Sequence, residues 1–275
     1  QVSKRVRKAC EKSLWTYGKT IYGDTWEIPP CKDHKRLADQ IQTAVEQGTK
    51  RAVAVERGFG KTSWCSYAVE WAALTGRCEM AMLLCGNQGE ADNLASGIVT
   101  NLEAHEPLFE IFPEITHFFR ETALHGAQFK PTFRDELLRL KRRPDIIFPA
   151  VPFTGGEVCI RCAGIEGKGV RGAHHNRSDG RRVRPTVVLL DDPQDDDLAR
   201  SSREVDKRES RIKKTVHGLG PPGRTLTVLM PCTPIEKNDL AERFLDHKRT
   251  PEYQGIKWPA LQAWPSCWEE IEGNL

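Results

Sequence analysis

The chain has 275 residues, of which 39% are hydrophobic and 29% are charged, a balance that suits one large α/β domain or two small ones. No apolar run is long enough to cross a bilayer, and the basic first residues lack the apolar stretch of a secretory signal, which excludes both kinds of segment. The nine cysteines follow no regular spacing, and the single C-x-x-C pair, Cys159 and Cys162, has no partner pair at zinc spacing. We therefore expect a reducing compartment and no disulfide framework.

The net charge of +3 is small, but the charged residues are clustered. Basic runs occupy 4–8, 141–143, 177–184 and 211–214, and an acidic run occupies 191–197. A single run of this kind is usually a solvated face. Four basic runs in one chain nevertheless indicate a surface that faces a polyanion.

The first part of the chain predicts an arm followed by a strand–turn–helix unit. Residues 1–30 have the composition of an irregular arm that ends in Ile-Pro-Pro. Apolar spacing predicts a helix that begins at Asp33 and stops at Gly48. A short apolar strand over 51–56 then leads through a glycine-rich turn into an amphipathic helix over 61–76.

Strands and helices alternate through the rest of the chain, apart from 104–150, where the pattern is mixed. This alternation predicts an α/β fold with a mainly parallel sheet flanked by helices. Further strands are expected over 80–87, 155–165, 186–190 and 225–230, and further helices over 91–102 and 201–216.

The turn AVERGFGKTSW ends like a phosphate-binding loop, G-x-x-x-x-G-K-[ST], but has Val55 where the first glycine would stand. Backbone N–H groups and the dipole at a helix N-terminus attract phosphate, provided that the residues nearby are small, as Gly58 and Gly60 are. Lys61 can reach the β- and γ-phosphates, and the Thr62 hydroxyl can ligate Mg²⁺. The loop therefore predicts binding of ATP and Mg²⁺; the alternative is a chance turn.

An apolar strand that ends in two acids, TVVLLDD, predicts the second half of such a site. In open α/β sheets, ligands bind at the carboxyl ends of the strands, where these acids lie. Asp191 is expected to hold Mg²⁺ through water, and Asp192 to orient and deprotonate the attacking water. The alternatives are that the acids only cap an exposed turn, or that 191–197 forms a two-metal nuclease centre, although such centres draw carboxylates from several strands.

Several stretches, in this order, combine into a specific pattern: ERGFGKT (56–62), EPLFEIFPEI (106–115), GIEGKGVRG (164–172) with RPTVVLLDDPQDD (184–196), VLMPCTPIEKNDL (228–240) and WPALQAWPSCW (258–268). Together they resemble the ATPase domain of the large terminase subunit, the DNA-packaging motor of tailed bacteriophages. The loop of that family also lacks the first glycine and has an arginine shortly before G-K-[ST].

The resemblance implies a RecA-like P-loop ATPase of the additional-strand, catalytic-acid type, which uses ATP and Mg²⁺ to move double-stranded DNA into a procapsid. It implies three protein partners: a portal protein, a small terminase subunit and further copies of the chain in a ring. The expected location is the cytoplasm of an infected bacterium and, transiently, the procapsid, with no membrane. The expected division is an arm or lid portion over 1–30, an ATPase core over 31–247, and the end of the ATPase domain over 248–275. Because the family's nuclease domain would follow that part, we expect no DNA cleavage from this chain.

The resemblance also implies residue roles. Arg57 is expected near the γ-phosphate of its own subunit, and Arg171 at a neighbour's site, with a structural or DNA-phosphate contact as the alternative for Arg171. Thr233 matches the position that senses hydrolysis, and His34 the position beside adenine; an ordinary strand-end hydroxyl and a surface histidine are the alternatives. The predicted catalytic residues are thus Asp192, Arg57 and Arg171, the nucleotide-binding residues Arg57, Gly58, Phe59, Gly60, Lys61, Thr62, Ser63 and His34, the Mg²⁺ ligands Thr62 and Asp191, and the coupling residue Thr233.

Two features depart from the family pattern and leave other functions open. Asp192 stands where many relatives have glutamate, and the loop 173–184 is unusually basic, which favours either DNA binding or disorder. The competing functions are an ATP-dependent nucleic-acid helicase or translocase core, and a nucleotide-gated DNA-binding module without turnover.

Overall fold

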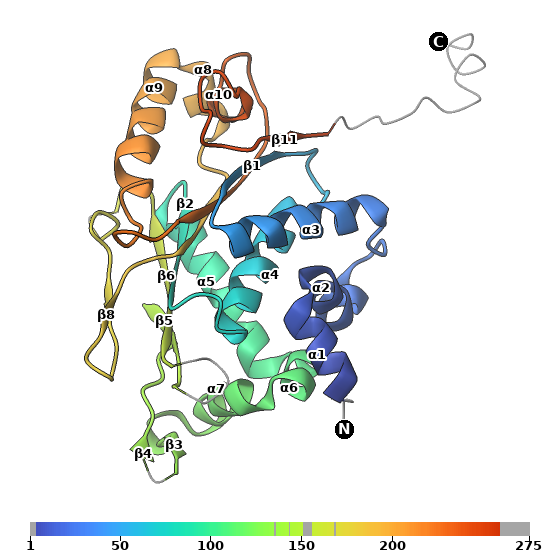
Figure 1. Cartoon of the computed structure of the whole chain (residues 1–275), viewed down its shortest axis with the longest axis vertical. Helices are drawn as coiled ribbons and strands as arrows, with labels where there is room; N and C mark the ends of the chain where they lie inside the picture. The colour runs from blue at the N-terminus through green and yellow to red at the C-terminus, as the bar shows by residue number, and fades with distance from the viewer. Residues whose placement is uncertain (1–3, 135, 143, 151–155, 168, 259–275) are drawn as a thin grey trace, which may run out of the picture.

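The computed structural model describes residues 4–134, 136–142, 144–150, 156–167 and 169–258. A seven-stranded sheet in the order β11-β1-β10-β9-β2-β6-β5 crosses the molecule (Figure 1). All neighbouring strands in it are parallel except β5, which is antiparallel to β6. The strands are β1 (Lys50–Ala54), β2 (Met80–Cys85), β5 (Asp145–Phe148), β6 (Val158–Gly164), β9 (Val187–Asp191), β10 (Thr227–Cys232) and β11 (Ile256–Lys257).

This architecture confirms the predicted mainly parallel sheet. Strand β10 lies between β1, which leads into the glycine-rich loop, and β9, which ends in the acids. Three strands thus end side by side at one edge of the sheet, because parallel neighbours point their carboxyl ends the same way. That edge is where the predicted site residues should meet.

Helices cover both faces of the sheet, so successive strand residues alternate between two cores. Leu189 and Leu229 belong to one core, and their chain neighbours Val188 and Val228 belong to the other. The first core lies under α3 (Lys32–Gln47), α4 (Lys61–Leu74), α5 (Gln88–Ala104), α6 (Glu106–Ile111) and α7 (Pro113–His125). The second lies under α9 (Ser202–Arg211), its π-helical continuation η3 (Ile212–Val216) and α10 (Leu240–Leu245), with α8 (Asp196–Arg200) leading into α9.

The expectation of an irregular N-terminal arm is wrong for the described residues. Two helices, α1 (Lys4–Lys12) and α2 (Leu14–Tyr22), are followed by a short 3₁₀ turn, η1 (Gly23–Thr25), and α2 packs against α3 and α4. Gly18 allows this close packing, since a Cβ there would lie 2.5 Å from the ring of Trp64. A glycine within a short segment lowers helix propensity, which is why the pattern misled the sequence prediction.

The remaining elements are small. They are the pairs β3 (Thr132–Phe133) with β4 (Glu136–Leu137) and β7 (His175–Asn176) with β8 (Arg182–Val183), and the turn η2 (Gly126–Gln128). The basic loop 173–184 is therefore an ordered hairpin, and the alternative of disorder is wrong. Among the described residues, no helix is long and apolar enough to cross a membrane, and all cysteines there are free thiols.

Candidate nucleotide site

The glycine-rich loop turns at Arg57 and Gly58, after the position where the usual phosphate loop has its first glycine. Val55 continues the buried strand and is almost inaccessible, so it has no part in the turn. The chain reverses around Arg57 and Gly58, where the Phe59 N–H donates to the carbonyl of Glu56 (3.5 Å). The first left-handed residue is Gly58, with φ of 83°. The loop thus keeps its glycine turn without a glycine at position 55.

The N-terminus of α4 opens toward this loop. Gly60, at φ 79°, precedes the helix and has no side chain with which to cap it. The first backbone N–H groups of α4 are therefore available to an anion. A Cβ on Gly60 would lie 2.4 Å from the ring of Trp26, so the close approach of this ring also requires glycine. Lys61 and Thr62 open the helix, and half-buried Ser63 follows in the same turn.

One hydrogen bond joins the two halves of the predicted site. The Thr62 hydroxyl donates to Oδ1 of Asp191 over 2.8 Å, although the two residues are 129 positions apart in sequence. Lys61, only 6% exposed, acts electrostatically on both Asp191 and Asp192. The structure therefore brings these four side chains together.

The two acids carry more negative charge than their surroundings compensate. Burial raises the pKa of Asp191 to about 6, the hydrogen bond from Thr62 opposes this shift, and the charge of Asp192 adds to it. Desolvation also raises the pKa of Asp192, while Lys61 and Arg57 lower it. A cation bound at this point would relieve the excess charge.

The donor set at Thr62 and Asp191 suits Mg²⁺. Hydroxyl and carboxylate oxygens are hard ligands, and Mg²⁺ is usually held by one or two protein carboxylates, with water and phosphate completing its coordination. No cluster of three or more His, Cys, Asp or Glu residues that could hold a metal occurs in the described part of the chain. The small donor set at Thr62 and Asp191 therefore fits Mg²⁺ with a phosphate ligand better than it fits a closed protein cage.

A cavity of about 560 Å³ lies beside the acids. Arg57, Asp192 and Thr233 line it, as do two residues that the sequence prediction missed, Gln194 and Arg200. The Arg57 side chain is 73% exposed and forms an ion pair with Asp196 (3.6 Å between Nη2 and Oδ1). Three of the predicted functional residues thus line one cavity.

Gln194 links the acid-bearing segment to the end of β10. Its Nε2 donates to the Thr233 carbonyl (3.0 Å) and to Oδ2 of Asp239 (2.9 Å), and its Oε1 accepts from the Leu240 N–H (2.8 Å). Asp239 is fully buried and caps α10 through the N–H of Glu242 (2.9 Å). This buried network, which the sequence prediction missed, connects the loop after Asp192 with α10.

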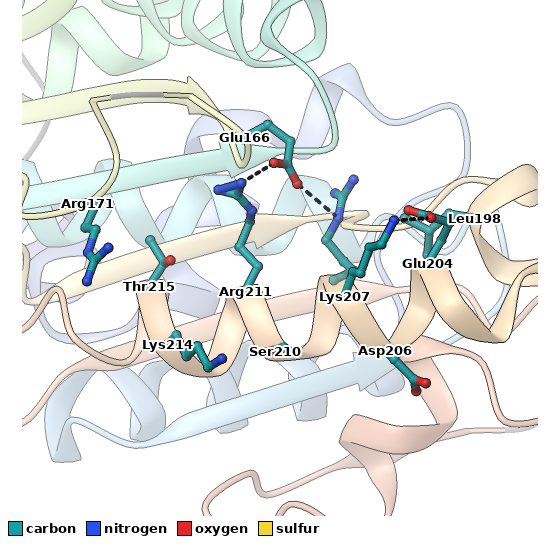
Figure 2. A pocket seen from close by; sticks show the side chains of 11 residues that line it. Glu166, Arg171, Leu198, Glu204, Asp206, Lys207, Ser210, Arg211, Lys214 and Thr215 are labelled. Carbon is teal, nitrogen blue, oxygen red and sulfur yellow. Dashed lines mark hydrogen bonds and ion pairs between the residues drawn. The ribbon is translucent and has the colours of Figure 1, made fainter.

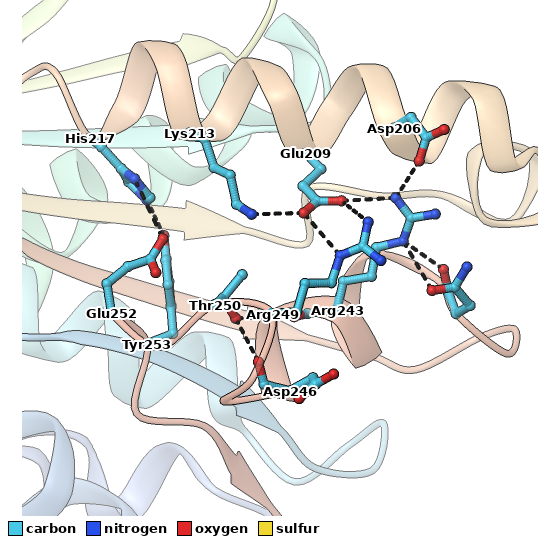
Figure 3. Close-up of polar contacts among 11 residues, drawn as sticks. Asp206, Glu209, Lys213, His217, Arg243, Asp246, Arg249, Thr250, Glu252 and Tyr253 are labelled. Carbon is cyan, nitrogen blue, oxygen red and sulfur yellow. Dashed lines mark hydrogen bonds and ion pairs between the residues drawn. The ribbon is translucent and has the colours of Figure 1, made fainter.

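From α10 the contacts continue to α9 (Figure 3). Arg243 on α10 donates to Asp206 (2.6 Å) and to Glu209 (2.8 Å) on α9, and Glu209 also accepts from Arg249 and Lys213. These ion pairs hold α9 and α10 together on one face of the sheet.

A further acid near the site, Glu90 in the first turn of α5, was also missed. Its charge raises the pKa of both Asp191 and Asp192. Glu90 lies near these acids because β2, which leads into α5, is the neighbour of β9 in the sheet. Only that order could have identified Glu90 as a neighbour of the acids.

His34 lies beside the glycine-rich loop. Its ring stacks on Phe59 (4.3 Å between centroids), and Nε2 lies 3.0 Å from the Phe59 carbonyl oxygen. Burial lowers the pKa of His34, and this carbonyl opposes the shift. Trp258 packs edge-on against Phe59, while the rest of the stretch 258–268 lies outside the described residues.

Arg171 is not brought to the cavity beside the acids. It lines a separate groove of about 800 Å³ along α9, with Lys214 and Arg211 nearby (Figure 2). In that groove Arg211 pairs with Glu166 (2.5 Å). Any role of Arg171 in nucleotide chemistry would therefore concern another subunit.

No protein-family model and no curated protein sequence matches the chain. Among solved structures, the large terminase of bacteriophage HK97 is similar over 94% of this chain and 46% of that chain, with a TM-score of 0.50 and 14% sequence identity. A mutant large terminase ATPase domain of Thermus phage P74-26 is similar over 90% of this chain and 93% of that chain, with a TM-score of 0.44 and 16% identity. The chain spans about half the length of the HK97 protein, and identity this low bears on the fold alone. Over the region that aligns with the HK97 protein, the chain has the fold of a bacteriophage large terminase.

Proposed function

We propose that this chain is the ATP-hydrolysing motor domain of a phage large terminase and drives double-stranded DNA into a procapsid. The observation that carries the proposal is the 2.8 Å hydrogen bond between Thr62 and Asp191. It joins the end of a phosphate-type loop to an acid at the end of another strand. The insertion of β10 between those strands and the likeness to the HK97 fold also support it.

In this proposal the N-terminus of α4 and Lys61 bind the phosphates of ATP. The backbone N–H groups after Gly60 point toward negative charge, and the helix dipole adds to the attraction. Mg²⁺ held by Thr62 and Asp191 would neutralise charge that develops on the phosphate oxygens. Ser63, Phe59 and His34 complete the nucleotide-binding residues, with His34 on the adenine side.

Asp192 is the general base of the proposed reaction. It lies at the cavity wall, and its raised pKa makes it a better proton acceptor than an ordinary surface aspartate. Arg57 leaves its exposed pair with Asp196 and stabilises the charge of the transferring phosphoryl group, a contribution that can reach about 10³–10⁵ in rate. Arg171 serves the site of a neighbouring subunit in the same way.

Thr233 passes the state of the site to the rest of the molecule. Its carbonyl accepts from Gln194, which follows the catalytic acid closely and also contacts the N-terminus of α10. A shift of the loop that contains Asp192 therefore moves Gln194, α10 and, through Arg243, helix α9. This path couples hydrolysis to a surface that grips DNA.

The proposed partners are duplex DNA, a portal protein, a small terminase subunit and further copies of the chain in a ring. The proposed location is the cytoplasm of an infected bacterium and, during packaging, the procapsid. Basic contacts to DNA phosphates do not depend on sequence, which suits a motor that must pass any sequence.

Steady-state ATP hydrolysis with excess Mg²⁺, with and without duplex DNA, tests the proposal. We expect hydrolysis that DNA stimulates, and a loss of about 10²–10⁴ in kcat for Asp192→Asn with nucleotide binding retained. Asp39→Asn is the matched control, since Asp39 is a half-exposed acid on α3 that pairs with Lys35 on the surface.

Two outcomes would replace the proposal by one of its competitors. Nucleotide binding without turnover, even in a concentrated assembly with DNA, would favour a gated DNA-binding module. Turnover stimulated by single strands but not by duplex DNA would favour a helicase core.

A further inference from the structure

A second charged cavity lies at the end of the sheet opposite the acids, where neighbouring strands begin. It measures about 320 Å³. Among the described residues, every cationic residue of its lining is an arginine, and the lining includes Arg181, Arg182, Arg184, Arg224, Glu79 and Thr186. We call it the arginine pocket.

The arginine pocket is separate from the candidate nucleotide site. Glu79 precedes β2, Thr186 precedes β9 and Arg224 lies just before β10, so the pocket sits at the amino ends of three adjacent strands. Hydrogen bonds from Thr186 N–H to the Met80 carbonyl (3.0 Å) and from Thr227 N–H to the Thr186 carbonyl (2.9 Å) hold these strand starts together. The acids lie at the other end of β9, about 16 Å away for a strand of this length.

The carboxylates near the pocket do not balance its arginines. Glu79 accepts from Arg177 (2.7 Å), Arg181 (2.5 Å) and Arg224 (3.4 Å), and Asp179 pairs with Arg177 and Arg181. Within the part of the chain that the structure describes, the contacts of the other two arginines involve no carboxylate: Arg182 lies 3.0 Å from a ring nitrogen of His174, and Arg184 donates to the Gly220 carbonyl (3.5 Å). Three guanidinium groups, including that of Arg177 beside the pocket, thus share two carboxylates, and with Arg182 and Arg184 the charges of these seven groups sum to +3.

Buried contacts and proline residues hold the pocket in a defined shape. Arg177 is largely buried and anchors the β7–β8 hairpin to Glu79, and Pro221 and Pro222 add conformationally restricted residues to the lining. Arg181 and Arg224 remain 55% and 66% exposed beside this scaffold. Glu79 lies between these two arginines, whereas Arg182 and Arg184 line the same pocket through contacts to His174 and the Gly220 carbonyl. The excess positive charge held at this surface would be offset by a bound anion.

We propose that the arginine pocket binds phosphate groups, either of a nucleic-acid backbone or of a free polyphosphate. The planar guanidinium fork matches phosphate oxygens in pairs, which favours phosphate over a simple halide or a lone carboxylate. The proposal goes beyond the proposed nucleotide site, because it requires neither ATP nor turnover.

The test is binding without ATP, measured by fluorescence anisotropy of a labelled duplex DNA over a range of salt concentrations. Pyrophosphate, added as a competitor and titrated alone by calorimetry, is the second arm. For Arg182→Ala/Arg224→Ala we expect at least about fivefold weaker DNA binding, and a slope of log K against log salt that falls by about 2, since each lost phosphate contact removes about 0.9. Glu79 keeps Arg177 and Arg181 as partners in this variant, so the fold should be retained, and circular dichroism checks this.

Lys12→Ala/Lys19→Ala, which changes two exposed lysines of α1 and α2, is the matched variant with the same loss of charge. If it leaves the slope unchanged while the arginine variant lowers it, the DNA arm supports the proposal. If only pyrophosphate binding is lost in the arginine variant, the ligand is a free polyphosphate. Equal effects of the two variants on DNA binding, or no effect of the arginine variant in either arm, would overturn the proposal. ATP hydrolysis without DNA should be unchanged in the arginine variant, and its absence in the unmodified protein would contradict the proposed function and not the pocket.

Discussion

Two carboxylates of this protein, buried Glu209 and partly exposed Asp191, have opposite electrostatic surroundings. Glu209 lies between α9 and α10 and accepts hydrogen bonds from Lys213, Arg243 and Arg249 (Figure 3). Burial alone would raise its pKa, but these hydrogen bonds outweigh burial and lower the pKa to about 2. Asp191, at the end of β9, has a pKa raised to about 6, because burial outweighs the hydrogen bond from Thr62.

The difference separates a structural cluster from a binding site. The cations around Glu209 already stabilise its charge, so the cluster needs nothing from outside the chain. At Asp191 the charge of Lys61 only partly offsets burial and the repulsion of Asp192. Perturbed acids of this sort gather where a ligand or metal supplies the missing positive charge. The comparison therefore predicts that changes at the two carboxylates affect stability in opposite directions.

The largest effect is expected where the site meets its ligand. Lys61→Ala should lower kcat for ATP hydrolysis by about 10²–10³, the loss seen when one charge-stabilising donor is removed from a transition state. Lys35→Ala is the control, because Lys35 is half exposed and pairs with Asp39 on the surface of α3. Measured hydrolysis in Lys61→Ala equal to that of the control would mean that the loop is not a phosphate site.

Glu209→Gln tests the structural cluster. Arg243, whose side chain is only 3% exposed, would keep Asp206 but lose its charged partner Glu209. Removing one partner of a buried ion pair typically costs 3–5 kcal/mol, and we expect about 3 kcal/mol from urea unfolding. Glu204→Gln, on the exposed side of the same helix, should leave stability almost unchanged, because its pair with Lys207 lies in solvent. Equal unfolding midpoints for the two variants would remove Glu209 from the stabilising interactions.

The pH dependence of stability should also show the stabilising contribution of Glu209. The pKa of Glu209 lies below its unfolded value of 4.5, so its stabilisation is complete above pH 4.5 and is lost as the pH falls toward about 2. Acid unfolding of the unmodified protein should therefore remove roughly 2–3 kcal/mol through this residue over that window. The Glu209→Gln variant should have a shallower slope there in urea titrations at successive pH values; identical slopes would contradict the assignment.

Some contacts at the candidate site could be predicted from the sequence, and others could not. Periodicity identified α4 and β9, and the residue types at their ends predicted that Thr62 and Asp191 would meet, because parallel strands end at one edge. The contacts of Gln194 and Asp239 could not be predicted in this way. They join two loop segments 45 residues apart, and nothing in local spacing says which loop polar groups pair.

The roles of several charged and aromatic residues also depend on contacts that form only in the folded chain. Glu90 is an ordinary acid of a helical first turn until β2 is placed beside β9. Helices α1 and α2 depend on the surface of α4 that receives Tyr17, whose hydroxyl donates to the buried Glu70. Arg177 was one member of a basic run, but the hairpin buries it against Glu79. In each case tertiary contacts, and not propensity, fixed the role of the residue.

Asp191→Asn should have the smallest effect, and one of opposite sign to that of Glu209→Gln. Since the folded pKa of Asp191 is raised, its stability contribution falls as the pH rises from 3.8 through about 6, so at pH 7 the charged carboxylate destabilises the fold. Asparagine keeps an oxygen that can accept from Thr62 and removes the charge. We therefore expect the variant without nucleotide to be about 1–2 kcal/mol more stable than the unmodified protein, allowing for partial solvent exposure.

Mg²⁺ and ATP should reverse that order. Ligand binding to the folded state adds stability in proportion to the logarithm of ligand concentration over Kd, about 2.7 kcal/mol at 100 times Kd. The unmodified protein should gain this shift in thermal unfolding, whereas Asp191→Asn, which lacks the negative charge that attracts the metal, should gain little. If the variant is less stable than the unmodified protein without ligand, the charge of Asp191 is already compensated within the chain. The contrast with Glu209 would then no longer mark a binding site.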